Sequence, residues 1–284
     1  MSLPLAWITG AGGLIGSHLV RAAATCALHW RTRGLTRAEL DLTDHDAVRA
    51  LFHQERPALV IHCAALSKSA DCQRNPELAR RVNVEATARL AELAADIPLI
   101  YFSTDLVFDG RQGNYDESAP VSPITVYGET KAAAEQLVQA NPRHTVIRTS
   151  LTYGVSPSGD RAFNEELLQA CRAGCAVRLF TDEIRCPIPA EVTVRAVWEL
   201  ASLNQPGLYH LAGSERLSRW DIGQVLATRW PELRASLEPG SLRDFRGAPR
   251  SPDTSLNCAK IQKLLTTPLP RFTEWIKAHS ASRP

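Results

Sequence analysis

The chain has 284 residues, of which 44% are hydrophobic and 22% charged, and its formal net charge is +2. Those values are typical of an ordinary globular protein with one large domain or two closely joined domains. The small and scattered positive charge argues against nucleic acid or an anionic membrane surface as a partner. No segment is long and apolar enough to span a bilayer, and the N-terminus leads directly into a strand, so we expect a cytoplasmic protein.

The N-terminal segment predicts a phosphate-binding unit. Residues 5–9 form a short apolar run typical of a buried strand, a glycine-rich turn follows at 10–16, and an apolar helical stretch covers 17–24. Gly10 permits the tight turn, Gly13 lets backbone N–H groups approach a pyrophosphate, and Gly16 lets helix and strand pack closely. We therefore expect the cofactor phosphates to be bound at Gly10, Gly13, Leu14, Ile15 and Gly16.

Strand-like and helix-like segments alternate along the rest of the first half. The predicted segments are 27–31, 44–55, 58–62, 76–95, 99–103, 127–140 and 144–148. This alternation predicts an α/β fold, a Rossmann-type doubly wound parallel sheet with helices on both faces. We assign residues 1–150 to a dinucleotide-binding domain. Residues 151–284, where prolines and loops dominate, form mainly a smaller substrate-binding region that can also return elements to the main sheet.

A ligand on such a sheet lies at the carboxyl ends of the strands. After the predicted second strand comes Trp30-Arg31-Thr32-Arg33, where an acidic residue would bind the ribose 2′-hydroxyl of NAD. Arg31 and Arg33 could instead pair with a 2′-phosphate, because guanidinium groups bind phosphate well. The sequence therefore favours NADP(H) over NAD(H), with solvated surface arginines as the alternative interpretation.

The later strand ends carry small and polar side chains. Asp41 and Leu42 would follow the third strand beside the adenine, and Cys63, Ala64 and Ala65 would follow the fourth, where the backbone must pass close to the cofactor. The fifth strand ends in Ser103-Thr104-Asp105. The Thr104 hydroxyl could hydrogen-bond a substrate carbonyl or carbinol, and a local turn that caps the strand end is the alternative.

Tyr127 and Lys131 lie four residues apart at a predicted helix start. Positions i and i+4 share one helix face, so the two side chains can act together. An isolated tyrosine has a pKa of about 10, and a neighbouring positive charge favours the phenolate. We therefore expect Tyr127 to be an acid–base group and Lys131 to supply the charge that lowers its pKa.

The seven cysteines, at 26, 63, 72, 171, 175, 186 and 258, are odd in number and show no C-x-x-C spacing. That pattern argues against a disulfide framework and against a structural zinc site. Cys171 and Cys175 lie four apart on a predicted helix, where small side chains filling a packed face are the favoured interpretation. We expect no metal.

Three motifs in this order carry a resemblance. Thr9-Gly-x-x-Gly-x-x-Gly16, Ser103-Thr-Asp105 and Tyr127-x-x-x-Lys131 together resemble the extended short-chain dehydrogenase/reductase family. More narrowly, the segments 103–110, 126–131, 148–150, 182–187 and 207–213 are similar to dTDP-4-dehydrorhamnose reductases and their relatives. The match covers nearly the whole chain.

The resemblance implies roles for single residues. Tyr127 would donate or remove a proton, Lys131 would hold the nicotinamide ribose, and Thr104 would orient the reacting oxygen. Asn83 matches the helix asparagine that supports a water relay to the lysine. The substrate contacts that we expect are Ser67, Thr104, Asp105, Leu151 and Arg185.

Two positions depart from the reductase pattern. Leu151 stands where those enzymes usually carry tryptophan, and Ala162-Phe163 replaces Asn-Phe. Because both positions help to hold the sugar in relatives, the departures bear on the substrate and leave the cofactor and proton-transfer residues intact.

Three functions follow as hypotheses. The first is an NAD(P)H-dependent reductase of the keto group of a nucleotide-linked sugar. The second is a sugar-nucleotide epimerase or dehydratase that retains NAD, and the third is a non-catalytic regulatory subunit like that of methionine adenosyltransferase. A small-molecule substrate is expected in the first two, and a homodimer is the assembly that the sequence allows.

Overall fold

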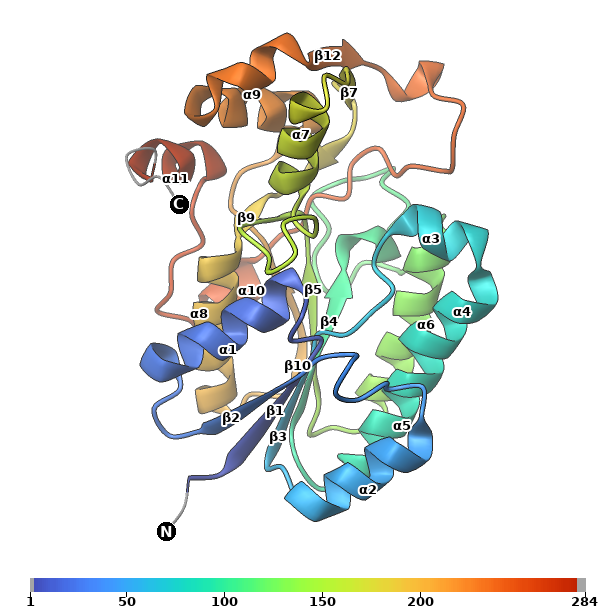
Figure 1. Ribbon diagram of the computed structural model, residues 1–284, viewed down its shortest axis with the longest axis vertical. Helices are drawn as coiled ribbons and strands as arrows, with labels where there is room; N and C mark the ends of the chain where they lie inside the picture. Colours follow the sequence, from blue (N-terminus) through green and yellow to red (C-terminus); the bar gives the residue numbers. More distant parts are fainter. Residues whose placement is uncertain (1–2, 280–284) are drawn as a thin grey trace.

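A sheet of six parallel strands forms the centre of the molecule, and the computed structural model describes residues 3–279 (Figure 1). The strand order is β10-β5-β4-β3-β1-β2. Their bounds are β1 Leu5–Thr9, β2 Arg31–Leu35, β3 Leu59–His62, β4 Leu99–Thr104, β5 Thr145–Thr149 and β10 Gly207–Leu211. From β1 the chain first adds β2 on one side and then β3 on the other side of β1. Such a switch point in the strand order forms a crevice at the carboxyl ends of the strands.

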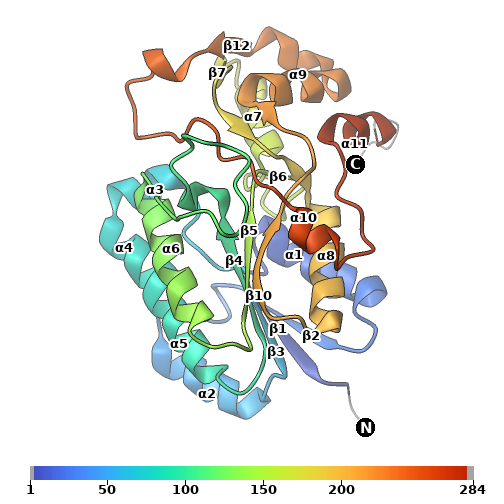
Figure 2. The ribbon, with the colours of Figure 1, turned by 180° about the vertical axis from the view of Figure 1, so that it is seen from behind.

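Helices cover both faces of the sheet (Figures 1 and 2). One face carries α1 Leu14–Cys26, α8 Ala190–Leu203 and α10 Ala259–Gln262, and the other carries α2 His45–Glu55, α5 Ala86–Leu93 and α6 Val126–Gln139. Successive residues of β1 point to opposite faces. Ile8 therefore packs with Trp198 of α8 in one apolar cluster, whereas Trp7 packs with Phe52 of α2 in the other.

Short elements complete the sheet domain on the α6 side. They are α3 Ser69–Arg74, α4 Pro76–Arg80, a π-helical turn at Arg81–Glu85 that continues into α5, and a 3-10 turn at Asp105–Val107. The segment predicted as one helix over 76–95 thus consists of α4, the π-helical turn and α5 in succession. π-helical turns inside helices often occur at functional sites.

The second half of the chain forms a smaller region above the carboxyl ends of the strands (Figure 1). Its helices are α7 Phe163–Arg172, α9 Arg219–Arg229, α11 Phe272–Ala278 and 3-10 turns at Pro231–Ala235 and Leu242–Asp244. Its paired strands are β7 Val177–Phe180 with β12 Leu237–Gly240, β8 Ile184–Arg185 with β11 Leu217–Ser218, and β6 Thr152–Tyr153 with β9 Ile188–Pro189. Phe163, Ile222 and Phe272 lie in its apolar core. Because α8 and β10 belong to the sheet domain, the chain crosses between the two parts more than once.

The predicted second strand at 27–31 is wrong. Helix α1 extends to Cys26, a turn closes with the Trp30 N–H donating to the Ala27 carbonyl at 2.9 Å, and β2 begins only at Arg31. An edge strand pairs on one side only and here carries exposed arginines, so it lacks the apolar run of a buried strand. The structure has no further strand between β2 and Asp41, so the predicted third strand is wrong, and the predicted fourth and fifth strands are β3 and β4.

None of the described helices has the length and apolar character needed to cross a membrane. Among residues 3–279, no three His, Cys, Asp or Glu side chains are grouped so that they could hold a metal ion.

Candidate active site

The glycine-rich turn joins β1 to α1 at the switch point. Gly10 has a φ of 69°, and a Cβ there would lie 2.7 Å from the backbone nitrogen of Ala64 in the loop after β3. A Cβ on Gly16 would lie 2.3 Å from the Gly10 carbonyl oxygen. Both glycines are therefore required sterically, whereas at Gly13 the nearest atom would be 3.2 Å away.

The start of α1 is suited to binding phosphate. The N-cap is Gly13, no side chain caps the helix, and its first turn contains no acidic residue. The N–H groups of Leu14, Ile15 and Gly16 lack acceptors within the helix, and the helix dipole adds positive potential there. The turn thus fits the pyrophosphate of a dinucleotide, with the glycine positions leaving room for close approach.

Arg31 and Arg33 do not lie at this site. Arg31 pairs with Leu5 at the opposite end of the sheet, about 13 Å before the carboxyl end of β2 at the usual rise per strand residue. Arg33 forms an ion pair with Glu55 at 2.9 Å. Neither arginine is therefore placed at the glycine turn, because β2 begins later than the sequence indicated, and their binding of a 2′-phosphate stays a prediction.

Thr36 and Arg37 are the residues that follow β2. The Arg37 side chain is 83% exposed and lies 3.5 Å from an Asp41 oxygen. Glu39 accepts hydrogen bonds from the Thr36 N–H at 2.9 Å and from the Thr36 hydroxyl at 2.7 Å, which lower the pKa of Glu39. Thr36 and Arg37 were not predicted as site residues, because the second strand was expected to end at residue 31 rather than at Leu35.

Asp41 and Leu42 lie in the loop between β2 and α2. The Asp41 carboxylate accepts from the Thr43 N–H and hydroxyl at 2.9 and 2.7 Å, and Leu42 packs against the apolar cluster beneath α2. Cys63, Ala64 and Ala65 directly follow β3, and the Thr9 hydroxyl accepts a long hydrogen bond from Ala64 N at 3.4 Å.

Helix α6 brings Tyr127 to the end of β4. Thr125 caps the helix by accepting from the Gly128 N–H at 3.0 Å, which places Tyr127 in the first turn. A Cβ on Gly128 would lie 2.2 Å from the Leu106 carbonyl oxygen, so only glycine permits this approach. The approach places the Tyr127 phenol within hydrogen-bonding reach of the Thr104 side chain.

Thr104 is buried at the end of β4. Its hydroxyl donates to Asp105 Oδ1 at 3.1 Å and accepts from the Leu106 N–H at 3.2 Å. The local turn weighed as the alternative therefore exists, and the same hydroxyl also faces Tyr127.

The electrostatics of Tyr127 and Lys131 differ from the expectation. Burial, followed by the negative charge of Asp105, raises the pKa of Tyr127, while the Thr104 hydrogen bond opposes the increase. Burial lowers the pKa of Lys131 to about 7, while the charges of Glu135, Cys63 and Cys72 oppose the decrease. The Lys131 Nζ lies 4.0 Å from the centre of the Tyr101 ring. In this state Lys131 does not lower the pKa of Tyr127, because burial weakens its charge and it is directed at Tyr101.

Asn83 connects the helices behind the site. It lies in the π-helical turn, and its side chain accepts from Leu66 N at 2.8 Å and donates to the Thr130 hydroxyl at 3.0 Å. Thr130 in turn donates to the Tyr127 carbonyl at 2.8 Å. The asparagine is thus buried and fixes both α6 and the loop after β3.

A histidine that the sequence analysis overlooked joins β1 to α5. His62 Nδ1 lies 2.7 Å from the Thr9 hydroxyl and Nε2 lies 3.0 Å from the Thr87 hydroxyl. Burial, followed by the charge of Lys131, lowers the pKa of His62 to about 3. The ring is therefore neutral at ordinary pH and acts as a hydrogen-bonding bridge. The sequence signal that could have identified His62 is a polar residue at the end of an apolar strand.

Of the expected substrate residues, Thr104, Asp105 and Arg185 lie together, because the Asp105 carboxylate contacts the Thr104 hydroxyl at 3.1 Å and Arg185 Nε at 3.7 Å. Arg185 is 5% exposed and donates from Nη1 to the carbonyls of Ile184 and Ser251 at 2.7 and 3.0 Å, and from Nη2 to Glu183 at 3.0 Å. Its guanidinium is thus engaged within the protein. Leu151 packs in the core of the smaller region, and Ser67 is exposed in the loop after β3.

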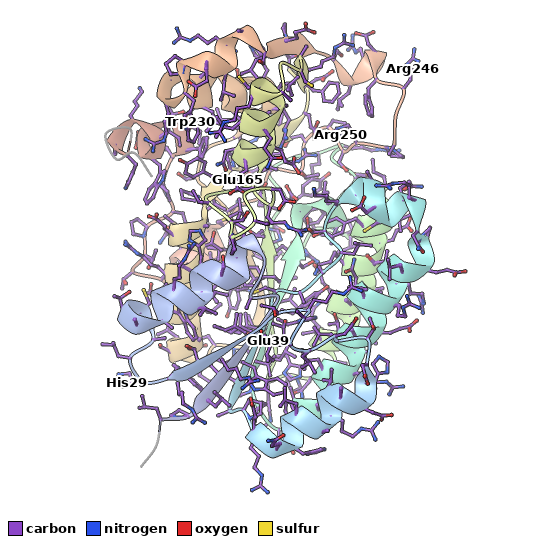
Figure 3. The ribbon with its side chains drawn as sticks, viewed as in Figure 1. His29, Glu39, Glu165, Trp230, Arg246 and Arg250 are labelled. Carbon is purple, nitrogen blue, oxygen red and sulfur yellow. The ribbon has the colours of Figure 1, made fainter. Side chains whose placement is uncertain are left out.

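Two other arginines, Arg250 and Arg219, lie near Glu183, the residue that pairs with Arg185. Arg250 binds both oxygens of Glu183, at 2.9 and 3.1 Å, and is part of the loop that follows β12, where Figure 3 also labels Arg246. The half-buried Arg219 lies over the Phe163 ring at 5.7 Å. Among the described residues its guanidinium has no hydrogen-bonded acceptor, and burial lowers its pKa despite the nearby Glu183.

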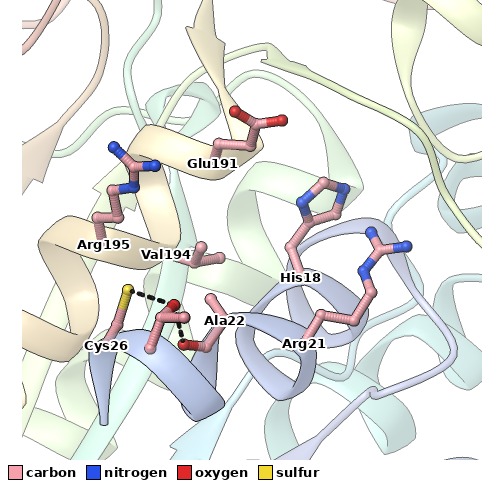
Figure 4. Close-up of a pocket in the computed structure, with 8 residues that line it drawn as sticks. His18, Arg21, Ala22, Cys26, Glu191, Val194 and Arg195 are labelled. Carbon is pink, nitrogen blue, oxygen red and sulfur yellow. Dashed lines mark hydrogen bonds between the residues drawn. The ribbon is translucent and has the colours of Figure 1, made fainter. Parts of the chain in front are cut away.

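Two hollows lie on the protein surface outside the catalytic residues. One, of about 220 Å³, lies between α1 and α8 and is lined by His18, Arg21, Glu191 and Arg195 among others (Figure 4). The other, of about 410 Å³, is bounded by Leu66 and residues of α3 and α4. Neither contains Thr104, Tyr127 or Lys131, so the chemistry is assigned from those side chains rather than from the hollows.

The doubly wound sheet, the glycine turn and the Thr-Tyr-Lys group define a dinucleotide-binding protein of the extended short-chain dehydrogenase/reductase class. Residues 6–282 match the family model described as RmlD substrate binding domain. The chain therefore belongs to that family.

Proteins with different functions in their names are similar to the chain. A probable low-salt glycan biosynthesis reductase of Haloferax volcanii is 34% identical over 78% of each chain. A dTDP-4-dehydrorhamnose reductase of Mycolicibacterium smegmatis is 31% identical over 94% of this chain and 82% of its own. Methionine adenosyltransferase 2 subunit beta of Xenopus laevis is 30% identical over 91% and 82%.

The fold also matches solved structures. The structure of a dTDP-4-dehydrorhamnose reductase from Bacillus anthracis in complex with NADP superposes with a TM-score of 0.88, at 23% identity over 98% of each chain. At that identity the likeness bears on the fold.

Proposed function

We propose that the protein is an NADP(H)-dependent reductase that acts on the keto group of a nucleotide-linked sugar. The observation that carries this proposal is the meeting of Thr104 and Tyr127 at the strand end beside a glycine turn that fits a dinucleotide. When bound, the reduced nicotinamide supplies a hydride. Reduction of a ketone builds negative charge on its oxygen, and an acid held against that oxygen stabilises the charge.

Tyr127 is the acid in this proposal. The phenol is protonated at neutral pH, so it can donate to the carbonyl oxygen, although burial raises its pKa and makes it a weaker acid than a free phenol. Lys131, buried one helical turn further along α6, would hold the nicotinamide ribose, whose hydroxyls would favour the charged ammonium by hydrogen bonding to it. Asn83 keeps α6 in register through Thr130.

The cofactor assignment moves from Arg31 and Arg33 to Arg37. Arg37 follows β2 at the carboxyl end, where the adenosine ribose lies in such folds. Its guanidinium is 83% exposed and pairs with Asp41 at 3.5 Å, and it would turn from that carboxylate to bind a 2′-phosphate. The NADP named in the Bacillus anthracis structure supports the choice of cofactor.

Two observations support an anionic, nucleotide-linked substrate. The names of the Haloferax and Mycolicibacterium relatives place them in sugar chemistry. In this chain, Arg219 offers a half-buried guanidinium that has no hydrogen-bonded acceptor within residues 3–279, beside the Arg185 and Arg250 pairs with Glu183. Guanidinium groups in such surroundings bind phosphate through paired hydrogen bonds.

The test is to incubate a panel of nucleotide-linked keto sugars with NADPH or NADH and to follow the absorbance of the reduced cofactor. We expect turnover with at least one sugar, loss of turnover in Tyr127→Phe, and unchanged cofactor binding in that variant by nicotinamide fluorescence. Tyr209→Phe, which removes a hydroxyl that donates to the Pro206 carbonyl at 3.3 Å, is the matched control. Undiminished turnover in Tyr127→Phe would refute the assignment.

A regulatory subunit is the competing function, because the Xenopus protein is about as similar as the reductases. It predicts no oxidation of NADPH with any sugar in the panel and no difference between wild type and Tyr127→Phe. An epimerase or dehydratase predicts tightly retained NAD after purification, which cofactor extraction measures.

A further inference from the structure

His62 joins three segments of the chain next to the glycine turn. It is the last residue of β3 and is 1% exposed. Its Nδ1 lies 2.7 Å from the hydroxyl of Thr9, the last residue of β1. Its Nε2 lies 3.0 Å from the hydroxyl of Thr87 on α5. Both ring nitrogens therefore have a hydrogen-bond partner, and both partners are neutral hydroxyl groups.

The direction of each hydrogen bond follows from the protons that these groups carry. The Thr87 hydroxyl donates its single proton to the Asn83 carbonyl at 2.8 Å, so toward His62 Nε2 its oxygen is an acceptor. A neutral ring with its proton on Nε2 accepts at Nδ1, and the Thr9 hydroxyl is the donor there. The Thr9 oxygen in turn accepts from the Ala64 N–H at 3.4 Å. The hydrogen bonds thus run in one direction, from Ala64 to Asn83.

A charged ring would not fit this network. With protons on both nitrogens, His62 would donate to Thr9, and the Thr9 proton would have no acceptor among the described residues. A buried hydroxyl that lacks an acceptor destabilises the fold. Burial, followed by the charge of Lys131, also lowers the pKa of His62 to about 3. The hydrogen-bond geometry and the burial therefore both favour the neutral ring with its proton on Nε2.

The network holds the loop after β3 against the glycine turn. Thr9 directly precedes Gly10, where a Cβ would lie 2.7 Å from Ala64 N, so the turn and this loop are in close contact. At the other end of the network, the Asn83 side chain accepts from Leu66 N at 2.8 Å and donates to the Leu66 carbonyl at 3.1 Å. The loop is therefore held at Ala64 through Thr9 and at Leu66 through Asn83, with the histidine between them.

We propose that His62 is a positioning residue for the dinucleotide, whose hydrogen bonds to Thr9 and Thr87 keep the glycine turn and the loop after β3 in the arrangement that binds the cofactor. This inference rests on the proposed function only in that a dinucleotide binds at the glycine turn, and it requires no sugar. Without these hydrogen bonds, the binding arrangement must be restored when the cofactor binds, and that cost lowers the affinity.

The experiment measures the dissociation constant of NADPH by its fluorescence and the free energy of unfolding of the same full-length proteins in urea. His62→Phe keeps an aromatic ring and removes both hydrogen bonds, and Thr9→Val removes the donor to Nδ1 at nearly constant volume. We expect each variant to raise the dissociation constant about tenfold, because a buried hydrogen-bonding group loses its partner. The double variant should bind no more weakly than His62→Phe, since both changes remove the same hydrogen bond.

Two comparisons separate this role from a general loss of stability. His62→Asn keeps an acceptor near the position of Nδ1, so it should bind NADPH at least about threefold more tightly than His62→Phe. His144→Phe is the matched control, because His144 is 3% exposed and precedes β5 at the opposite end of the sheet. It should leave the NADPH affinity unchanged, whatever its effect on the free energy of unfolding.

The nitrogen magnetic resonance spectrum of the ring gives a second readout in wild type. At neutral pH the His62 signals, identified by their absence in His62→Asn, should show a neutral ring with its proton on Nε2. A proton on Nδ1 or a charged ring would contradict the proposed network.

Wild-type affinity for NADPH in either His62→Phe or Thr9→Val would overturn the inference, as would an equal loss of affinity in His144→Phe or no recovery in His62→Asn. Should His62→Phe not fold, Thr9→Val and the ring signal decide in the same way. Wild type that binds neither NADPH nor NADH would refute the proposed function and this inference with it. NADPH binding that is the same in wild type and the variants would refute this inference alone.

Discussion

Lys131 should destabilise the folded protein near neutral pH. Replacing it should raise the free energy of unfolding while removing activity. Burial at 3% exposure lowers the pKa of Lys131 from its ordinary 10.5 to about 7. Each unit corresponds to about 1.4 kcal/mol, so the penalty for folding with this lysine is about 4 kcal/mol at pH 7. Stability of this kind is commonly given up at active sites.

The sign follows from the two pKa values. Below about pH 7 the lysine is protonated in both states, and the penalty is complete. As the pH rises toward 10.5, the unfolded chain also loses the proton, and the penalty falls to about 1 kcal/mol at pH 10. The stability of wild type relative to Lys131→Met should therefore increase by about 3 kcal/mol between pH 7 and pH 10.

Urea unfolding of wild type and Lys131→Met at several pH values measures this difference, because the other titrating groups contribute equally to both proteins and cancel. Methionine is an apolar side chain of similar length and leaves little cavity. Lys68→Met, at an exposed position in the loop after β3, is the matched control for removing a lysine charge. A difference for Lys131→Met that is constant with pH, or that grows from pH 7 to pH 10, would refute the reasoning.

Two further predictions concern the cofactor and the helix that carries the tyrosine. Arg37→Ala should raise the KM for NADPH about tenfold and leave that for NADH nearly unchanged, whereas Arg31→Ala should change neither; steady-state kinetics with both cofactors measure this. Equal effects of the two variants would contradict the assignment. Gly128→Ala should lower the free energy of unfolding by about 1–3 kcal/mol and kcat at least about tenfold, because its Cβ would displace α6 from the Leu106 carbonyl. Full activity in Gly128→Ala would show that this approach is not required.

The strand prediction failed in one place and for a definite reason. The apolar runs that became β1, β3 and β4 are buried on both faces, and such runs are recognisable in a sequence. Strand β2 lies at the sheet edge with Arg31 and Arg33 exposed, so it lacks that signal. The error shifted the predicted cofactor residues toward the start of β2, to Arg31 and Arg33, and away from Arg37, the residue that we propose for this role.

The sequence also could not predict hydrogen-bond partners that lie far apart along the chain. Arg185 looked like a substrate ligand in the sequence, but the carbonyl of Ser251, 66 residues away, and Glu183 occupy its guanidinium. Asp105 looked like a substrate contact too, yet Thr254, 149 residues away, donates to it. No local pattern specifies such partners, because they depend on how the smaller region is folded against the sheet.

The sequence by itself determined the class of fold, the family, the glycine turn and the group Thr104, Tyr127 and Lys131. Those features depend on local spacing, since glycines must occur where the backbone passes close and an i, i+4 pair shares a helix face. Only the tertiary structure decided the protonation of that group. Burial weakens the charge of Lys131, and the negative Asp105 lies beside the phenol, so Tyr127 is held as an acid rather than as the phenolate that the isolated spacing indicated. The field at a buried site is set by every charge and solvent-excluding residue around it, whatever their separation along the chain.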